Sequence, residues 1–423
     1  MATVETVNSI PWWKEPTKDQ WLAWVAAWLG WTLDAFDFTI FLLIMLPIAQ
    51  EFNVPLTAVT IVFTLTLWMR LLGATAAGWL ADRMGRRTPL MISILWYSIC
   101  NFIAGFSPTF WFLFVFRALL GFGMGAEWPA GAALAMESWP IRSRGFMSGV
   151  LQGSWGLGFL LSSAAYGALY TSIGWRGLLW LGILPALTVV YVRYFVKEPP
   201  VWVENRRRQR AEKREVRLPL LSIFKRGMIG NTALACWWMA GGLVTYYSIN
   251  GMFATHLQKD LGLGPALIAT PIILANLVVF LSSSAWGFAG DRIGRRWAMI
   301  IPGLLGIPVL LVYAQRQLHR DCDRFRPAGG PSRRRRRQPG AILHDRAVSN
   351  RGAGHGERLL LSPGDYLWRY CAAADTYFAV DYNLGFSIPM LVGCVIGGAS
   401  WCLALFLGPE TKGKEMVPDL VLA

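Results

Sequence analysis

Five ionisable side chains of this sequence lie inside long apolar runs, where a charge is costly and usually serves a function. Asp34 and Asp37 lie in WTLDAFDF, and their i, i+3 spacing puts both on one face of a helix. A carboxylate held away from water tends to take up a proton rather than stay charged. Both residues are therefore proton-coupling candidates, and the alternative is a structural pair with an arginine of a neighbouring helix.

The other three ionisable residues are Arg70, Arg117 and Glu127. An arginine keeps its charge, and its planar fork suits a carboxylate, so Arg70 and Arg117 are substrate-binding candidates. A structural aspartate partner is an open alternative for Arg70, and for Arg117 a carboxylate in the first run is favoured. Glu127 follows Arg117 by ten residues, about 15 Å along one helix, and is a third proton-coupling candidate.

Uncharged polar side chains in later apolar runs could hydrogen-bond a small molecule held among those runs. Gln152 and Trp155 lie in the fifth apolar run, and Tyr246, Tyr247 and Asn250 lie in the seventh. Each of them is also explained by ordinary packing, and the sequence leaves that alternative open.

The elements that must position these residues are membrane helices. The chain is 54% hydrophobic, with 22 Trp and a mean hydropathy of +0.40, and only 15% of it is charged, against about 25% in soluble proteins. Crossing the membrane core takes about 20 apolar residues. Ten runs approach that length: 21–49, 58–81, 89–107, 110–136, 146–169, 176–196, 229–255, 266–290, 297–314 and 377–408.

One short loop occurs twice, as GWLADRMGRR at Gly78 to Arg87 and as GFAGDRIGRR at Gly287 to Arg296, 209 residues later. Its charges must lie at the membrane surface, and two copies indicate two similar halves. We expect these loops to latch helices during conformational change rather than to contact substrate. The positions they share are Gly78, Asp82, Arg83, Gly85, Arg86 and Arg87 in the first copy and Gly287, Asp291, Arg292, Gly294, Arg295 and Arg296 in the second.

This repeated G-x-x-x-D-R-x-G-R-R pattern resembles the signature of the major facilitator superfamily. Within it, LDAFDF, GMGAEWPAGAALAMESWP and KEPPVW resemble the sialate:proton symporter family of sialic acid and lactate/pyruvate permeases. The resemblance implies an all-α fold of two six-helix halves that imports a carboxylate with protons and needs no cofactor beyond the proton gradient. A sugar or aromatic-acid proton symporter is the alternative. We expect halves at 1–196 and 229–423, joined by a cytoplasmic linker at 197–228.

The net charge of +15 and the run Arg333 to Arg337 invite a nucleic-acid interpretation. Basic residues instead cluster in alternate loops, the positive-inside bias of membrane proteins. That bias predicts a multi-pass protein of the cytoplasmic membrane with both termini in the cytoplasm and no nucleic-acid partner. The six cysteines show no metal-ligand spacing, and no nucleophile or metal constellation indicates an enzyme. We expect a monomer that contacts the bilayer and a small carboxylate.

The pattern of spans breaks between Arg316 and Tyr370, which holds thirteen arginines, no lysine and no membrane-length apolar run. A charged insert is one interpretation; we favour a reading-frame shift over about 316–375. Codons compatible with residues 338–374 can spell, in a shifted frame, a segment with ERFPTEVRG at positions 346–354. The first half has ESWPIRSRG at positions 137–145, again 209 residues earlier. Helices ten and eleven of the expected twelve are then missing from this chain.

Overall fold

The structure is a computed structural model that describes residues 11–136, 139–198, 203, 204, 207, 229–259, 261–306, 309 and 387–408. Regular structure in these residues is helical throughout, because apolar chain in a bilayer must satisfy its backbone groups within each segment. Three short 3-10 turns are η1 (Trp12–Lys14), η2 (Ile141–Ser143) and η3 (Leu181–Ile183). The α-helices are α2 (Lys18–Glu51), α3 (Leu56–Met84), α4 (Arg87–Ala104), α5 (Phe110–Met124), α6 (Glu127–Met136), α7 (Arg144–Trp180), α8 (Ala186–Phe195), α11 (Ile229–Lys259), α12 (Pro265–Ile293) and α16 (Ser387–Leu407).

Local sequence explains where several helices begin and end. The side chain of Thr17 accepts a hydrogen bond from Gln20 N while Gln20 bonds back to Thr17 N, a capping box that starts α2. Gly85 (φ 96°) and Gly294 (φ 99°) follow the last residues of α3 and α12 in a backbone conformation that favours glycine. The two copies of the repeated loop therefore end their helices in the same way.

The structure refines three of the predicted spans. The runs 146–169 and 176–196 form two helices that meet at Gly174 (φ 64°, ψ −173°), a non-helical residue inside α7, and the second helix leads through η3 to α8. Only glycine adopts that backbone conformation readily, so the chain turns there without a polar loop. The run 110–136 is interrupted between α5 and α6, and Glu127 becomes the first residue of α6.

Six described stretches are long and apolar enough to cross a membrane, fewer than the ten predicted runs. α4 and α11 are not among them, because their apolar stretches are less hydrophobic than those of the other long helices. The ninth run is helical over 295–306, and most of the linker, the segment 316–375 and residues 377–386 lie outside the described residues. The six stretches are Lys18–Glu51, Leu56–Gly78, Phe110–Met136, Arg144–Phe195, Pro265–Ile293 and Ile388–Leu407.

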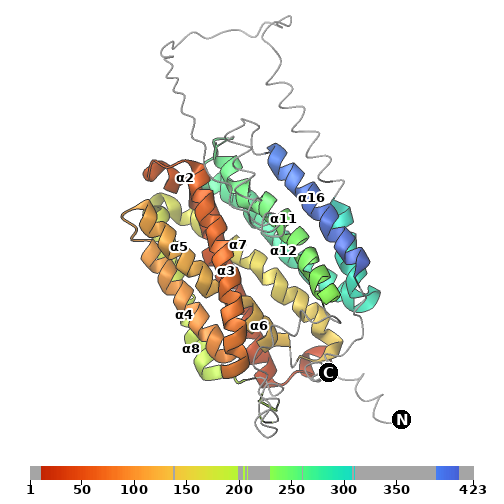
Figure 1. Cartoon of the computed structure of the whole chain (residues 1–423). Helices are drawn as coiled ribbons and strands as arrows, with labels where there is room; N and C mark the ends of the chain where they lie inside the picture. The colour runs from red at the N-terminus through yellow and green to blue at the C-terminus, as the bar shows by residue number, and fades with distance from the viewer. Residues whose placement is uncertain are drawn as a thin grey trace, which may run out of the picture.

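The helices form two groups, with α2 to α6 and α8 on one side and α11, α12 and α16 on the other (Figure 1). α7 packs against both α2 and α12 and so joins the two groups. Glycines allow the closest approaches: Gly121 of α5 lies against the Thr66 carbonyl of α3, and Gly149 of α7 lies against Gly287 of α12. α2 is the most deeply buried of the described helices, and it carries Asp34 and Asp37.

Candidate functional site

An ion pair between α2 and α3 forms the centre of the candidate site. Arg70 Nη2 donates to Asp34 Oδ2 at 2.5 Å. The side chain of Asp34 is 0% exposed, whereas that of Arg70 is 16% exposed and therefore retains some contact with the outside. A buried carboxylate of this kind depends on its cation, because the pair is taken out of water together.

Aromatic rings surround the guanidinium of Arg70. Its Cζ lies 5.5 Å from the ring centroid of Trp31, 5.5 Å from that of Trp155 and 5.8 Å from that of Phe38. Distances below about 6 Å are in the range of cation–π attraction. We call these rings, together with Tyr246 and Tyr247, the aromatic box.

The two tyrosines of the box come from α11, in the second group of helices. Trp155 Nε1 donates to Tyr246 Oη at 2.6 Å, and the ring of Tyr247 lies 6.1 Å from that of Phe38. Asn250 Nδ2 donates to the Tyr246 carbonyl at 3.1 Å, one turn back on its own helix, and Gln152 is exposed. The box is therefore built where the two helix groups meet, and Tyr247 belongs to it while Gln152 and Asn250 do not.

Two further buried charges of opposite sign, Asp37 of α2 and Arg117 of α5, attract each other without a hydrogen bond between them. Both side chains are wholly buried. Arg117 Nη1 donates to Asn101 Oδ1 at 3.4 Å, and its Cζ lies 4.2 Å from the centroid of Phe41. The structure thus places Arg117 with a carboxylate of the first helix and Arg70 in the aromatic box.

Glu127, the first residue of α6, is buried against α2. Its carboxylate packs against Gly30 of α2 so closely that an added methyl group would overlap Glu127 Oε1. It interacts electrostatically with both Asp34 and Arg70. The five ionisable residues singled out in the sequence therefore form one buried network on α2, α3, α5 and α6.

Several atoms of this network have no hydrogen-bond partner among the described residues, although buried polar atoms in proteins are nearly always paired. Unpaired carboxylate oxygens next to unpaired guanidinium nitrogens suit a site that gains and loses protons or binds an anion. The unpaired atoms are Asp34 Oδ1, Asp37 Oδ1 and Oδ2, Arg117 Nε and Nη2, and Glu127 Oε1 and Oε2.

The repeated loops lie away from this network. Asp291 Oδ2, at the end of α12, accepts from Phe146 N at the start of α7 at 3.0 Å, which links the two helix groups. At the end of the first loop, the Glu198 carboxylate accepts from Arg86 N at 2.8 Å and from Arg87 N at 3.0 Å. The side chains of Asp82 and Arg83 lie outside the described residues.

The remaining loop residues make local contacts. Gly78 has open space beside it, whereas Gly287 lies against Gly145 and Gly149 of α7. Arg292 lies over the Phe288 ring at 4.4 Å, and Arg296 Nη1 donates to the Gly408 carbonyl at 3.2 Å. Arg295 interacts electrostatically with Arg144 at the start of α7.

Comparison with known families decides the identity. The model of the Major Facilitator Superfamily matches residues 27–317. The chain belongs to the major facilitator superfamily. It is therefore a polytopic membrane transporter rather than an enzyme, which confirms the fold and family predicted from the repeated loop. The match ends next to the segment for which a shifted frame is predicted.

Similar proteins include transporters of different compounds. The sialic acid transporter NanX of Escherichia coli is 28% identical over 293 residues, covering 69% of this chain and 70% of that protein. A probable 4-methylmuconolactone transporter of Cupriavidus pinatubonensis is 31% identical over 299 residues, covering 69% and 67%. The solved structure of the xylose transporter XylE from E. coli is similar in fold, with a TM-score of 0.59 at 15% identity over 95% of this chain and 100% of that chain.

Some residues of the site were not singled out in the sequence. Trp31 and Phe38 lie in the same run as the aspartates, three residues before Asp34 and one after Asp37, where an aromatic side chain is unremarkable in a membrane helix. Tyr97 and Asn101 are spaced i, i+4 on α4, and that spacing places them on one helix face. A search for polar side chains on one face of the third run would have found this pair.

Proposed function

We propose that this transporter imports a small organic acid together with protons. The observation that carries the proposal is the buried Arg70–Asp34 ion pair inside the aromatic box, at the junction of the two helix groups. A substrate carboxylate is the natural competitor for that guanidinium, because it carries the same negative group that Asp34 presents to Arg70.

The competition supplies a coupling mechanism. When a substrate carboxylate binds Arg70, Asp34 remains buried without its cation. An uncompensated buried carboxylate is strongly disfavoured, so Asp34 takes up one proton and becomes neutral. Release of the substrate returns Arg70 to Asp34 and expels the proton. One proton then accompanies each carboxylate through this site.

A planar unsaturated or aromatic acid is the second candidate substrate, beside monocarboxylates and sialic acid. The observation that favours it is the set of rings around Arg70, on which a flat substrate can stack while its carboxylate binds the guanidinium. The names of the similar transporters, for sialic acid and for a methylmuconolactone, agree with either candidate.

Uptake into proteoliposomes tests the proposal. Lactate, pyruvate, sialic acid, benzoate and xylose are offered to the chain and to a version with the frame of residues 318–374 restored, with and without an inward proton gradient. We expect the frame-restored version to accumulate at least one of these acids. A protonophore should abolish that accumulation. Gradient-driven xylose uptake without acid uptake would replace the proposal with the sugar alternative.

The remaining features of the proposal follow from the same arrangement. We infer a monomer in the cytoplasmic membrane with both termini in the cytoplasm, driven by the proton gradient without a further cofactor. The halves would meet across a linker at 197–228 and rock around the aromatic box, with the two repeated loops as latches at the cytoplasmic surface.

A further inference from the structure

We propose that the hydroxyl of Tyr97 relays protons between the Asp34–Arg70–Glu127 group and the Asp37–Arg117 group. The inference deepens the proposed function, because it concerns how protons reach and leave the group that the substrate displaces. Tyr97 takes part in none of the hydrogen bonds or ion pairs described above.

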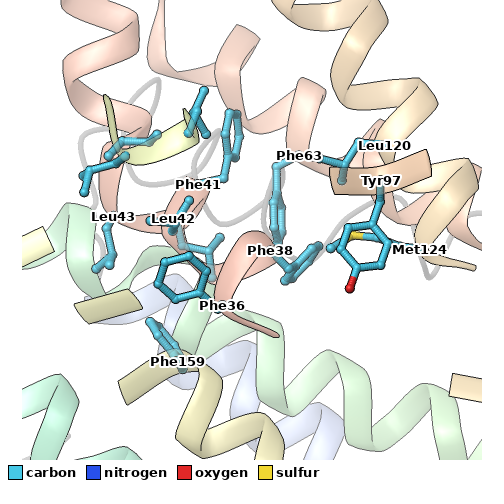
Figure 2. Close-up of a cluster of buried hydrophobic side chains, with 14 of the residues drawn as sticks. Phe36, Phe38, Phe41, Leu42, Leu43, Phe63, Tyr97, Leu120, Met124 and Phe159 are labelled. Carbon is cyan, nitrogen blue, oxygen red and sulfur yellow. The ribbon is translucent and has the colours of Figure 1, made fainter. Parts of the chain in front are cut away.

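The position of Tyr97 is the first observation. It lies on α4 in the apolar cluster that includes Phe38, Leu120 and Met124 (Figure 2), and its side chain is 0% exposed. Its Oη has no hydrogen-bond partner among the described residues. A phenylalanine would fill this space without leaving a polar atom unpaired, so packing does not explain a tyrosine here.

The charges that face Tyr97 are the second observation. The hydroxyl interacts electrostatically with Glu127 of α6, with Asp34 and Asp37 of α2 and with Arg70 of α3. Four charged groups of the network are thus within electrostatic range of this phenol. The fifth, Arg117 of α5, is hydrogen-bonded to Asn101, which lies one turn after Tyr97 on α4.

A phenol suits the task because its oxygen can accept a proton from one carboxylic acid while its own proton passes to another carboxylate. Starting from protonated Asp37 and ionised Asp34, the proton of Asp37 passes to Tyr97 Oη and the former phenol proton passes to Asp34. One O–H bond forms and one breaks at Tyr97, which stays neutral, and the net result is one proton moved from Asp37 to Asp34. Because Tyr97 Oη has no hydrogen-bond partner among the described residues, each transfer crosses a bridging water, which general acid–base chemistry allows.

The test follows protonation of the network in the full chain, without any substrate. The chain in lipid nanodiscs is subjected to a rapid pH drop, and the carboxylic acid C=O stretch is followed by time-resolved infrared spectroscopy, with bands assigned by their loss in Asp34→Asn and Asp37→Asn. We expect Tyr97→Phe to slow protonation of Asp34 at least tenfold with the final amplitude unchanged. Proton transfer by a positioned group typically contributes about 10²–10⁴-fold, so a change below about tenfold would overturn the proposal.

Two controls separate a relay from a structural role. Tyr191→Phe also removes a tyrosine hydroxyl of this helix group, one bonded to the Leu22 carbonyl, and should leave the rate unchanged. Fluorotyrosine at position 97 keeps the hydroxyl and should keep the fast rate. Wild-type kinetics in a folded Tyr97→Phe protein would overturn the proposal, as would a slow fluorotyrosine protein. Failure of the proposed function would instead show as absent substrate uptake with this pH response intact.

Discussion

The two helix groups differ in what they bury. Among the described residues, the buried charged side chains are Asp34, Asp37, Arg117 and Glu127, all in α2, α5 and α6. The buried polar side chains of α11 and α12 are Ser248, Thr255, His256 and Asn276, with no acid, arginine or lysine among them. The repeated loop indicates two halves of similar fold, so the difference lies in the side chains placed on that fold.

This difference has a physical reason. A buried charge is tolerated when its partners are close and fixed, so charges of both signs gather within one rigid bundle. The facing bundle presents the hydroxyls and rings of Tyr246 and Tyr247, which can slide without breaking an ion pair. Among the described residues, the first group therefore holds the buried charges, and the second group contributes uncharged polar side chains and aromatic rings.

The largest expected effect comes from the second group, where the frame of residues 318–374 is predicted to be shifted. Restoring it should turn a chain without measurable transport into one with uptake, because the twelve arginines of this segment cannot enter hydrocarbon at roughly 2.5–3.5 kcal/mol each. Uptake by both chains in proteoliposomes is the measurement. Equal uptake by the chain as written would show that the segment is a functional insert.

Resequencing the gene gives an independent check of the same prediction. The shift requires one extra base near the codons for Gln315 to Leu318 and one missing base near the codon for Ala374. A read that confirms the written frame would leave a real lesion or a genuine insert, and the uptake comparison decides between those two.

The next largest effect should come from the centre of the first group. Asp34→Asn in the frame-restored chain should reduce the accumulation ratio of substrate to about one, because an amide cannot exchange a proton. Exchange of substrate across the membrane should survive, since Arg70 is still available for the carboxylate. Asp19→Asn, which removes an exposed partner of Lys197, is the matched control and should accumulate normally. Uphill uptake by Asp34→Asn would move coupling to Glu127.

The sequence predicted most of the fold and the membership of this network, but not its pairing. Long apolar runs and the repeated loop specify spans and halves because hydrocarbon allows few alternatives. Which arginine meets which aspartate depends on helix rotation and on glycine contacts such as Gly121 with Thr66, and no one-dimensional spacing encodes those. The aromatic box was missed in part because a ring on a membrane helix is common, and only its distance to Arg70 distinguishes it.

A smaller effect is expected from the glycines that bring α3 and α5 together. Gly121→Val should destabilise the first group by about 1–3 kcal/mol, because its side chain would meet the backbone carbonyl of Thr66, which cannot rotate away. Gly78 lies on α3, the helix that carries Thr66, but it has open space beside it. Gly78→Ala should therefore be neutral or stabilising by up to about 1 kcal/mol. Thermal unfolding in detergent measures both. Equal melting temperatures for the two variants would show that the close approach contributes nothing.

The smallest effect is expected at the contact between Asp291 of α12 and Phe146 N of α7, beside the repeated loops. Phe146 is the third residue of α7, where a helix-capping side chain normally accepts from the backbone. Ser143, the residue before α7, makes no such bond; its hydroxyl accepts from Trp139 Nε1 instead, and Asp291 of α12 accepts from the third residue of the helix. Asp291→Ala should therefore cost about 1 kcal/mol, the usual value of a cap.

That loss should also favour separation of the two groups, by about fivefold for 1 kcal/mol. Spin labels at Met84 and Ile293, the exposed ends of α3 and α12, would report it as a larger population at long distance. Glu198→Gln is the matched control, because Glu198 caps α4 within the first group and should lower stability without changing that distance. If both variants shift the distance equally, the loops act through general stability, and Asp291 is not the contact that holds the two groups together.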